Sequence, residues 1–214
     1  QESFDQGALV REYVKWDYEL RNADQLEAVI DRAFEMATAE PCGPVYLSIP
    51  RELLAQRIDF ISADVPSRRV VDARRYPDPS RLIEAAELLV AARNPVIVTS
   101  EIGRDVAARE ALVELAEAGG FGVLEASPVY ANFPPSHPCH LGYLFASQVR
   151  EELVDADVVL VVESDVPWFE ARTPMRESTR VIQLGIEPFY QRYPMRGFRC
   201  DVPIIADPAP ALRE

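Results

Sequence analysis

The chain has 214 residues, of which 22 are Lys or Arg and 35 are Asp or Glu, so its formal net charge is −13. An acidic chain without a basic cluster repels phosphate backbones, and its longest apolar run, Val158–Val162, is far shorter than the roughly 20 residues of a membrane-spanning helix. We therefore expect neither a nucleic-acid nor a membrane partner. With 48% hydrophobic and 27% charged residues, the chain is globular in composition, and its length predicts one domain plus a fraction of another.

The cysteine count and the first residues both indicate a reducing compartment. Cys42, Cys139 and Cys200 stand far apart, which does not suggest a disulfide framework. The first ten residues have neither the basic nor the apolar region of a signal peptide. We expect a cytoplasmic protein.

Residues 1–55 predict one helix and one strand. The helix spans 24–39, with Asp24 as its N-cap and Glu27 three residues later. Its expected apolar face is Leu26, Val29, Ile30, Ala33, Phe34 and Ala37. A short strand follows at 45–49, so this segment is a partial α/β unit. Residues 56–78 have no sustained period and contain two Arg pairs, which predicts a linker between domains.

Helices and apolar strands alternate over residues 79–214. Asp78 and Asp105 are expected to cap two helices, and the first helix is expected to bury Leu82, Ile83, Ala86, Leu89 and Val90. Ser147 is expected to start a short helix that ends near Leu153. The predicted strands are 95–99, 122–125, 158–162, 181–186 and 202–206, with a long Pro-rich loop between the second and the third. This pattern predicts the α/β class, with a Rossmann-like doubly wound parallel sheet preceded by a partial α/β segment.

The loop after the first of these strands, Thr99–Asp105, is one candidate site. Ligands of such folds bind at the carboxyl ends of the strands, and a dinucleotide loop would have Gly-x-Gly-x-x-Gly there. Only Gly103 is present, and Glu101 and Asp105 would repel phosphate, partly offset by Arg104. A nucleotide contact and an ordinary solvated loop both remain open.

The loops after two later strands carry further acids. Glu163 and Asp165 would suit an acid/base pair, but no nucleophile or metal ligand is evident beside them. Trp168 and Phe169 would either stack on a ligand or pack against protein, and packing is favoured. Glu187 stands where Rossmann folds often place the acid that binds a ribose hydroxyl, although an exposed loop acid is an equal interpretation.

The Pro-rich loop contains His137, Cys139 and His140. A zinc site needs a second set of ligands, which is not evident, so we expect this segment to pack over the sheet edge and to bind no metal. We assign no catalytic residue, because no Gly-x-Ser-x-Gly, Walker A, Cys-x-x-Cys or His-Glu-x-x-His motif occurs.

Several segments together resemble thiamine-diphosphate-dependent enzymes of the acetolactate synthase or 2-oxo acid decarboxylase type. Val14–Leu26 and Gly43–Glu52 resemble the end of that family's pyrimidine-binding domain, which has the pattern G-P-V-x-L-x-x-P. Phe133–Gly142 is similar to its F-P-x-x-H-P-x-x-L-G loop. Asp155–Val162 and Val181–Pro188 match a strand A-D-x-V-L-x-x-G and a strand V-I-x-I-D-I-D-P of its central domain.

The resemblance implies a division at 1–55 (the C-terminal part of the pyrimidine-binding domain), 56–78 (linker) and 79–214 (central domain). It also implies that the full-length enzyme binds thiamine diphosphate and Mg²⁺ in a homo-oligomer, a dimer or a tetramer, through a glutamate early in the pyrimidine domain and a Gly-Asp-Gly motif. Neither feature is found in this sequence, so we expect a fragment that is inactive by itself. The expected substrates are 2-oxo acids or acyl-CoA compounds, with carboligase or decarboxylase chemistry.

Central domains of this family bind FAD, ADP or nothing. Here Gly185 stands where the family often has an acid, and the glycine-rich loop is missing, and both departures disfavour FAD. The residues expected to line an ADP-type or vestigial pocket are Glu101, Gly103, Asp165 and Glu187. The alternative function is a stand-alone nucleotide-binding or oligomer-interface Rossmann module without catalysis.

Overall fold

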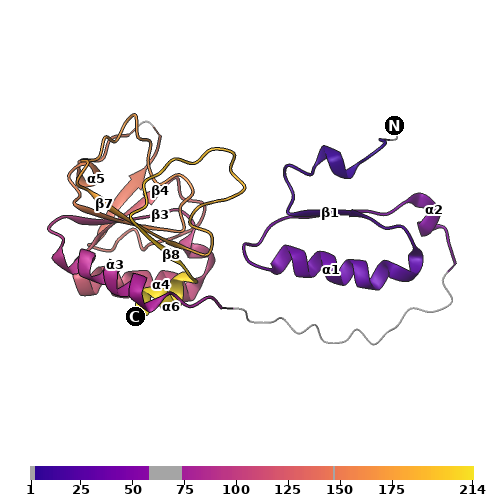
Figure 1. Cartoon of the computed structure of the whole chain (residues 1–214), viewed down its shortest axis with the longest axis horizontal. Helices are drawn as coiled ribbons and strands as arrows, with labels where there is room; N and C mark the ends of the chain where they lie inside the picture. The colour runs from indigo at the N-terminus through magenta and orange to yellow at the C-terminus, as the bar shows by residue number, and fades with distance from the viewer. Residues whose placement is uncertain (1–2, 58–73, 147) are drawn as a thin grey trace. The chain divides into compact units, whose positions relative to one another are not determined.

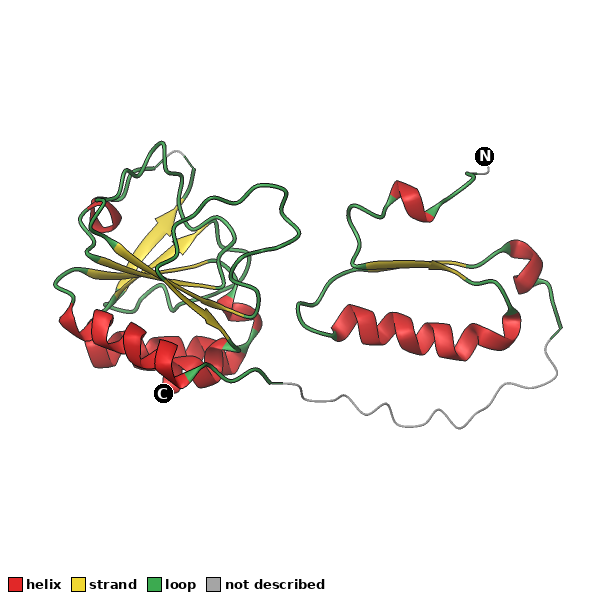
Figure 2. Cartoon of the chain, viewed as in Figure 1, coloured by secondary structure: helices red, strands yellow, loops and turns green. Residues whose placement is uncertain are grey.

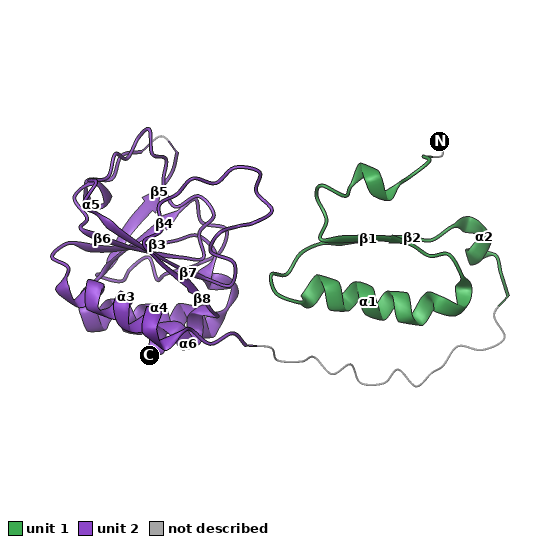
Figure 3. Cartoon of the chain, in the orientation of Figure 1, with its two compact units in different colours: residues 1–71 green, residues 72–214 purple. Residues whose placement is uncertain are grey.

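The computed structural model describes residues 3–57, 74–146 and 148–214. The chain divides into two compact units, residues 1–71 and 72–214 (Figure 3). Most of the predicted linker, residues 58–73, lies outside the described residues. The domain limits expected from the sequence therefore stay predictions.

Unit 1 is a two-stranded parallel sheet with one long helix alongside. Its elements are η1 (Gly7–Leu9), β1 (Trp16–Glu19), η2 (Ala23–Gln25), α1 (Leu26–Thr38), β2 (Val45–Ser48) and α2 (Arg51–Leu54). Trp16 pairs with Val45 and Glu19 with Ser48. Among the described hydrophobic residues of this unit, only Leu20 and Ala33 are buried. Unit 1 thus contains very little core.

Three details of unit 1 differ from the sequence-based expectation. β1 was not predicted, because Trp16–Glu19 is not an apolar run and becomes a strand only by pairing with β2. Asp24 is not the cap, since the Asn22 side chain accepts from the Asp24 N–H at the start of η2, and α1 begins at Leu26. Phe34, expected on the apolar face, is 55% exposed.

Unit 2 is a six-stranded parallel sheet. Its strands are β3 (Pro95–Thr99), β4 (Gly122–Ala126), β5 (His140–Leu144), β6 (Val158–Val162), β7 (Arg180–Gly185) and β8 (Val202–Ile205). Their order across the sheet is β5-β4-β3-β6-β7-β8. The chain winds outward from β3 in one direction and, from β6, in the other, so the switch point of the topology lies between β3 and β6. The predicted doubly wound parallel sheet is confirmed.

The two faces of this sheet are covered differently. The helices of the unit are α3 (Pro79–Ala91), α4 (Val106–Gly119), α5 (Glu151–Val154) and α6 (Pro208–Arg213). α3, α4 and α6 lie together along one face (Figures 1 and 2) and bury Leu89, Leu112 and Leu212 against the sheet. The other face packs on α5 and long loops, with Leu153 and Trp168 in its core. Among the described helices, none is long and apolar enough to cross a bilayer.

Local signals at the helix ends behave as expected. The Asp78 side chain accepts from the Ser80 N–H, and the Asp105 side chain accepts from the Ala107 N–H. Gly120 ends α4 in the left-handed region, with φ 66°. These two caps and this glycine confirm the limits predicted from the sequence for α4 and the start predicted for α3.

Three expectations for unit 2 were wrong. The Pro-rich loop contains β5, which pairs with β4 through an irregular register near Val123 and Leu124. The short helix begins at Glu151, and Ser147 lies outside the described residues. In α3, Ile83, Ala86 and Val90 are exposed and Ala85 is buried, because the face that packs on the core is rotated from the predicted one and includes Leu88 and Ala92.

Candidate functional site

The carboxyl ends of β3, β6 and β7 carry a group of charged residues next to the switch point. We call this group the strand-end cluster: Glu101 and Arg104 after β3, Glu163 and Asp165 after β6, and Glu187 after β7. Because parallel strands end at the same edge of the sheet, residues from distant parts of the sequence meet there. Three of the four predicted site residues, Glu101, Asp165 and Glu187, belong to this cluster.

Glu163 is the best-anchored member of the cluster. Its Oε2 lies 2.8 Å from Arg104 Nη2, and its Oε1 accepts from the Ile186 N–H at 2.7 Å. The side chain is only 7% exposed, and its backbone φ is 46°, which is uncommon for any residue but glycine. The sequence suggested an acid/base role, whereas the structure ties this carboxylate to groups from two neighbouring loops.

The loops after β3 and β6 are bonded directly to each other. The Ser100 and Glu101 N–H groups donate to the Glu163 carbonyl at 3.2 and 3.0 Å. The Ser100 and Ser164 hydroxyls lie 2.6 Å apart, and Ser100 Oγ also donates to the Ala126 carbonyl. These bonds cross the switch point itself.

Asp165 is held by residues from the segment after β7. Its Oδ2 accepts from the Tyr193 hydroxyl at 2.8 Å, and its carbonyl accepts from Arg196 Nε at 3.0 Å. Burial and the bond to Asp165 raise the pKa of Tyr193 to about 12, and burial lowers the pKa of Arg196. The Arg196 guanidinium lies over the rings of Tyr190 and Phe198, so this segment packs across the end of β6.

Glu101 is partly buried among like charges. Burial, and then the charges of Asp165 and Glu163, raise the pKa of Glu101, and Arg104 opposes this effect. The carboxyl group of Glu101 therefore holds a proton more tightly than an exposed glutamate does.

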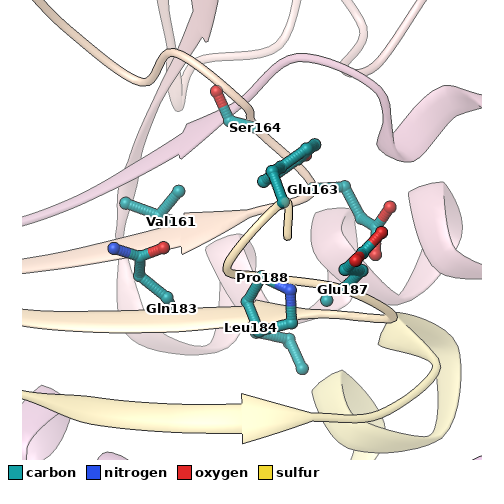
Figure 4. Close-up of a pocket in the computed structure, with 9 residues that line it drawn as sticks. Val161, Glu163, Ser164, Gln183, Leu184, Glu187 and Pro188 are labelled. Carbon is teal, nitrogen blue, oxygen red and sulfur yellow. The ribbon is translucent and has the colours of Figure 1, made fainter. Parts of the chain in front are cut away.

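Glu187 lines a small cavity between the ends of β6 and β7 (Figure 4). The cavity measures about 10 Å³ and is lined by Val161, Glu163, Ser164, Gln183, Leu184, Gly185, Glu187, Pro188 and Tyr190. Glu187 Oε1 also accepts from the Gln191 N–H at 3.2 Å. Gln183 Oε1 is buried and, among the described residues, has no hydrogen-bond partner. A cavity of this size holds one water molecule at most.

The fourth predicted site residue, Gly103, has a packing reason to be glycine. A Cβ there would lie 2.5 Å from the Ala131 carbonyl oxygen. Its N–H donates to Asn132 Oδ1 at 2.9 Å. Gly103 thus holds the loop after β3 against the Pro-rich loop, and its contact with a ligand stays a prediction.

A buried polar network behind this loop was missed by sequence reasoning. Glu125 accepts from Asn132 through Oε2 and lies 3.0 Å from His140 Nε2 through Oε1. Asn132 Nδ2 also donates to the carbonyls of Ser100 and Tyr130. The available signal was a glutamate inside an apolar strand, since a buried carboxylate requires partners.

The predicted packing of the Pro-rich loop is seen in part. His137 lies 3.1 Å from Glu117, while His140 is on β5 and pairs with Glu125, so the two histidines have separate partners. No group of three or more metal-ligating side chains occurs in the described parts of the chain. Trp168 is 1% exposed and packs edge-on against Phe198, as expected for a packing role, whereas Phe169 is 40% exposed.

The chemistry available at this edge is limited by these contacts. Glu163 and Asp165 are both hydrogen-bonded within the fold, and the hydroxyls beside them are bonded as well, Ser164 to Ser100 and Tyr193 to Asp165. The sequence contains no Gly-Asp-Gly, the motif through which the resemblance implies binding of thiamine diphosphate and Mg²⁺. Within the cluster, the Glu163 and Asp165 side chains each connect separate loops.

Comparison with known proteins places this architecture in a family. Residues 82–214 match the model of the thiamine pyrophosphate enzyme central domain. The chain is 35% identical to a benzoylformate decarboxylase of Pseudomonas aeruginosa over 86% of its own length and 36% of that protein. It is 33% identical to a sulfoacetaldehyde acetyltransferase of Rhodobacter capsulatus over 86% of its length and 32% of that protein.

A solved structure agrees with this match. The X-ray structure of a protein from Mycobacterium smegmatis, described as a thiamin diphosphate-dependent enzyme, superposes with a TM-score of 0.76 at 26% identity. The superposition covers 98% of this chain and 40% of the Mycobacterium smegmatis chain. The present chain spans about a third of the length of the two curated relatives named above. The chain belongs to the thiamine-pyrophosphate-dependent enzyme family, and its residues 82–214 are the central domain.

Proposed function

We propose that this chain is part of a longer thiamine-diphosphate-dependent enzyme that acts on 2-oxo acids or acyl-CoA compounds. The observation that carries the proposal is the central-domain match over residues 82–214, with relatives that align over 86% of the chain. One of these relatives is named a decarboxylase and the other an acetyltransferase, so both lyase and carboligase chemistry are retained as alternatives. In this proposal residues 1–55 end the pyrimidine-binding domain and 56–78 link it to the central domain.

The structure of unit 1 supports its assignment as a part of a larger domain. A two-stranded sheet is marginally stable by itself, and this one pairs β1 with β2 alone in the described residues. Within its described part, residues 3–57, the buried apolar residues are Leu20 and Ala33, which is too small a core for an independent domain.

The proposal also includes the cofactor, the metal ion and the oligomer of the whole enzyme. Thiamine diphosphate and Mg²⁺ would be bound by residues outside this chain, in a cytoplasmic homo-oligomer. The central domain contributes a rigid parallel sheet whose strand-end loops are bonded to one another. We infer that the 214-residue chain alone has no turnover.

The test is an assay of the full-length protein with a panel of 2-oxo acids and acyl-CoA compounds, thiamine diphosphate and Mg²⁺. Release of CO₂ without a ligated product indicates a decarboxylase, and formation of a new carbon–carbon bond indicates a carboligase. Omitting the cofactor or chelating the metal should abolish either signal. The proposal fails if no substrate of the panel is consumed, and the inference about the isolated chain fails if that chain is active above a no-protein control.

A further inference from the structure

The switch point of a doubly wound sheet is normally open. There the loops of neighbouring strands leave in opposite directions, and the crevice between them receives a ligand, often with its anionic group against backbone N–H groups. In this chain that position lies between the ends of β3 and β6. Two backbone N–H groups at this position are already used, because those of Ser100 and Glu101 donate to the Glu163 carbonyl.

The Glu163 side chain sits at the same edge. Its carboxylate contacts Arg104, from the loop after β3, and the Ile186 N–H, from the loop after β7, at 2.8 and 2.7 Å. A cation and a free backbone N–H at strand ends are the groups that would bind an anionic ligand. The backbone φ of 46° at Glu163 shows that the fold holds this residue in an uncommon conformation.

Gly185 provides the space that this carboxylate fills. A Cβ on Gly185 would lie 2.8 Å from Glu163 Oε1, closer than carbon and oxygen atoms normally approach. The Glu163 carboxylate therefore fits in this place only because residue 185 has no side chain. What is left open beside them is the cavity of about 10 Å³.

We propose that the Glu163 carboxylate is a built-in substitute for a bound anion, and that it closes the switch point of this domain to nucleotides. FAD and ADP need pockets of several hundred Å³. At the switch point the loops after β3 and β6 are instead bonded to each other, and the neighbouring cavity between the ends of β6 and β7 measures only about 10 Å³. The inference concerns this domain alone and does not depend on the thiamine chemistry proposed for the longer enzyme.

The first experiment titrates the unmodified chain with ADP and with FAD in a calorimeter. We expect no binding heat from either nucleotide. Saturable binding of ADP or FAD would overturn the proposal, and this arm needs no variant.

The second experiment removes the carboxylate and supplies one from solution. Glu163→Gly also relieves the backbone at φ 46°, and removes the carboxylate that contacts Arg104 and the Ile186 N–H. Formate should raise the thermal midpoint of this variant by about 3–5 °C relative to chloride at equal ionic strength, once its concentration is about ten times its dissociation constant. The wild type and the matched variant Glu163→Gln, which keeps the side chain in place, should respond equally to the two salts. An equal response of Glu163→Gly to formate and chloride would contradict the proposal.

A third measurement tests the pairing with Gly185. Gly185→Ala should lower the urea midpoint of the wild type, because its Cβ meets Glu163 Oε1, and should have much less effect in the Glu163→Gly background. Equal effects in both backgrounds would show that the two positions are independent, which the proposal does not allow.

Discussion

Asn132 offers the sharpest test of how the strand-end loops are held. Its side chain is fully buried and joins three segments of unit 2. The two N–H groups of Nδ2 are shared among three acceptors, the Ser100 carbonyl, Glu125 Oε2 and the Tyr130 carbonyl, at 2.9, 3.1 and 3.0 Å. Oδ1 accepts from the Gly103 N–H at 2.9 Å. Replacing Asn132 with Ala removes all four contacts.

The expected loss of stability follows from the types of hydrogen-bond partner that Asn132 has. A neutral hydrogen bond contributes about 1 kcal/mol and one to a charged group about 1.5–3 kcal/mol, while buried groups left unpaired add their own desolvation penalty. We therefore expect Asn132→Ala to lower the free energy of unfolding by about 3–5 kcal/mol. The Asn132 N–H still donates to Glu125 Oε2 in the variant, so the carboxylate keeps a backbone partner. At about 2 kcal/mol per molar urea, the midpoint should fall by roughly 2 M.

The assay is urea unfolding followed by tryptophan fluorescence. Trp16 lies in unit 1, whereas Trp168 is 1% exposed in the core of unit 2. A Trp16→Phe background therefore makes the signal specific for the unit that contains Asn132. Asn94→Ala is the matched control, because the Asn94 side chain is exposed, and it should change the unfolding free energy by less than about 0.5 kcal/mol.

Two outcomes would refute this reasoning. A loss of less than about 1 kcal/mol in Asn132→Ala would mean that the four contacts are replaced by solvent at little cost. A loss equal to that of the Asn94 control would mean that the network does not stabilise the fold. Asn132→Asp separates shape from hydrogen bonding, since it keeps the size but places a second carboxylate beside Glu125, and it should be at least as destabilising as Ala.

Three further predictions concern single positions. Gly103→Ala should destabilise unit 2 by about 2–4 kcal/mol in the same urea assay, because the added Cβ meets the Ala131 carbonyl. Gly197→Ala is the control, since its added Cβ meets nothing within 4 Å, and it should be neutral or slightly stabilising. Burial alone would raise the pKa of Asp157, but backbone N–H donors lower it overall. The ionised Asp157 therefore stabilises the folded state above about pH 4, and this stabilisation is lost as the pH falls through the folded-state pKa. Asp157→Asn should flatten the plot of unfolding free energy against pH in that acid range, and an unchanged plot would contradict this role of Asp157. Glu101 has a raised pKa, so its ionisation destabilises the folded state as the pH rises above about 4. In thermal melts, Glu101→Gln should therefore be more stable than the wild type at pH 7 but not at pH 3. A Glu101→Gln variant that is less stable than the wild type at pH 7 would contradict the raised pKa.

The sequence predicted most of the architecture of unit 2 because the signals for it are local. Apolar runs such as Val158–Val162 become central strands wherever both faces of a sheet are covered, and Asp78 and Asp105 cap helices through bonds to residues two positions away. The family, too, follows from motifs that stand in order along the chain. Local information fails where a segment depends on a distant partner, as in β1, which pairs with residues almost thirty positions later.

For the candidate site, too, local sequence signals predicted some features, and others depend on the tertiary structure. Sequence reasoning selected Glu101, Asp165 and Glu187, because acids that follow apolar strands gather at one edge of a parallel sheet. Only the tertiary structure decided that Glu163 turns into the space above Gly185 and bonds to Arg104 and Ile186. A one-dimensional pattern specifies which residues reach the end of a strand, whereas the distance between side chains on different strands depends on packing across the whole sheet.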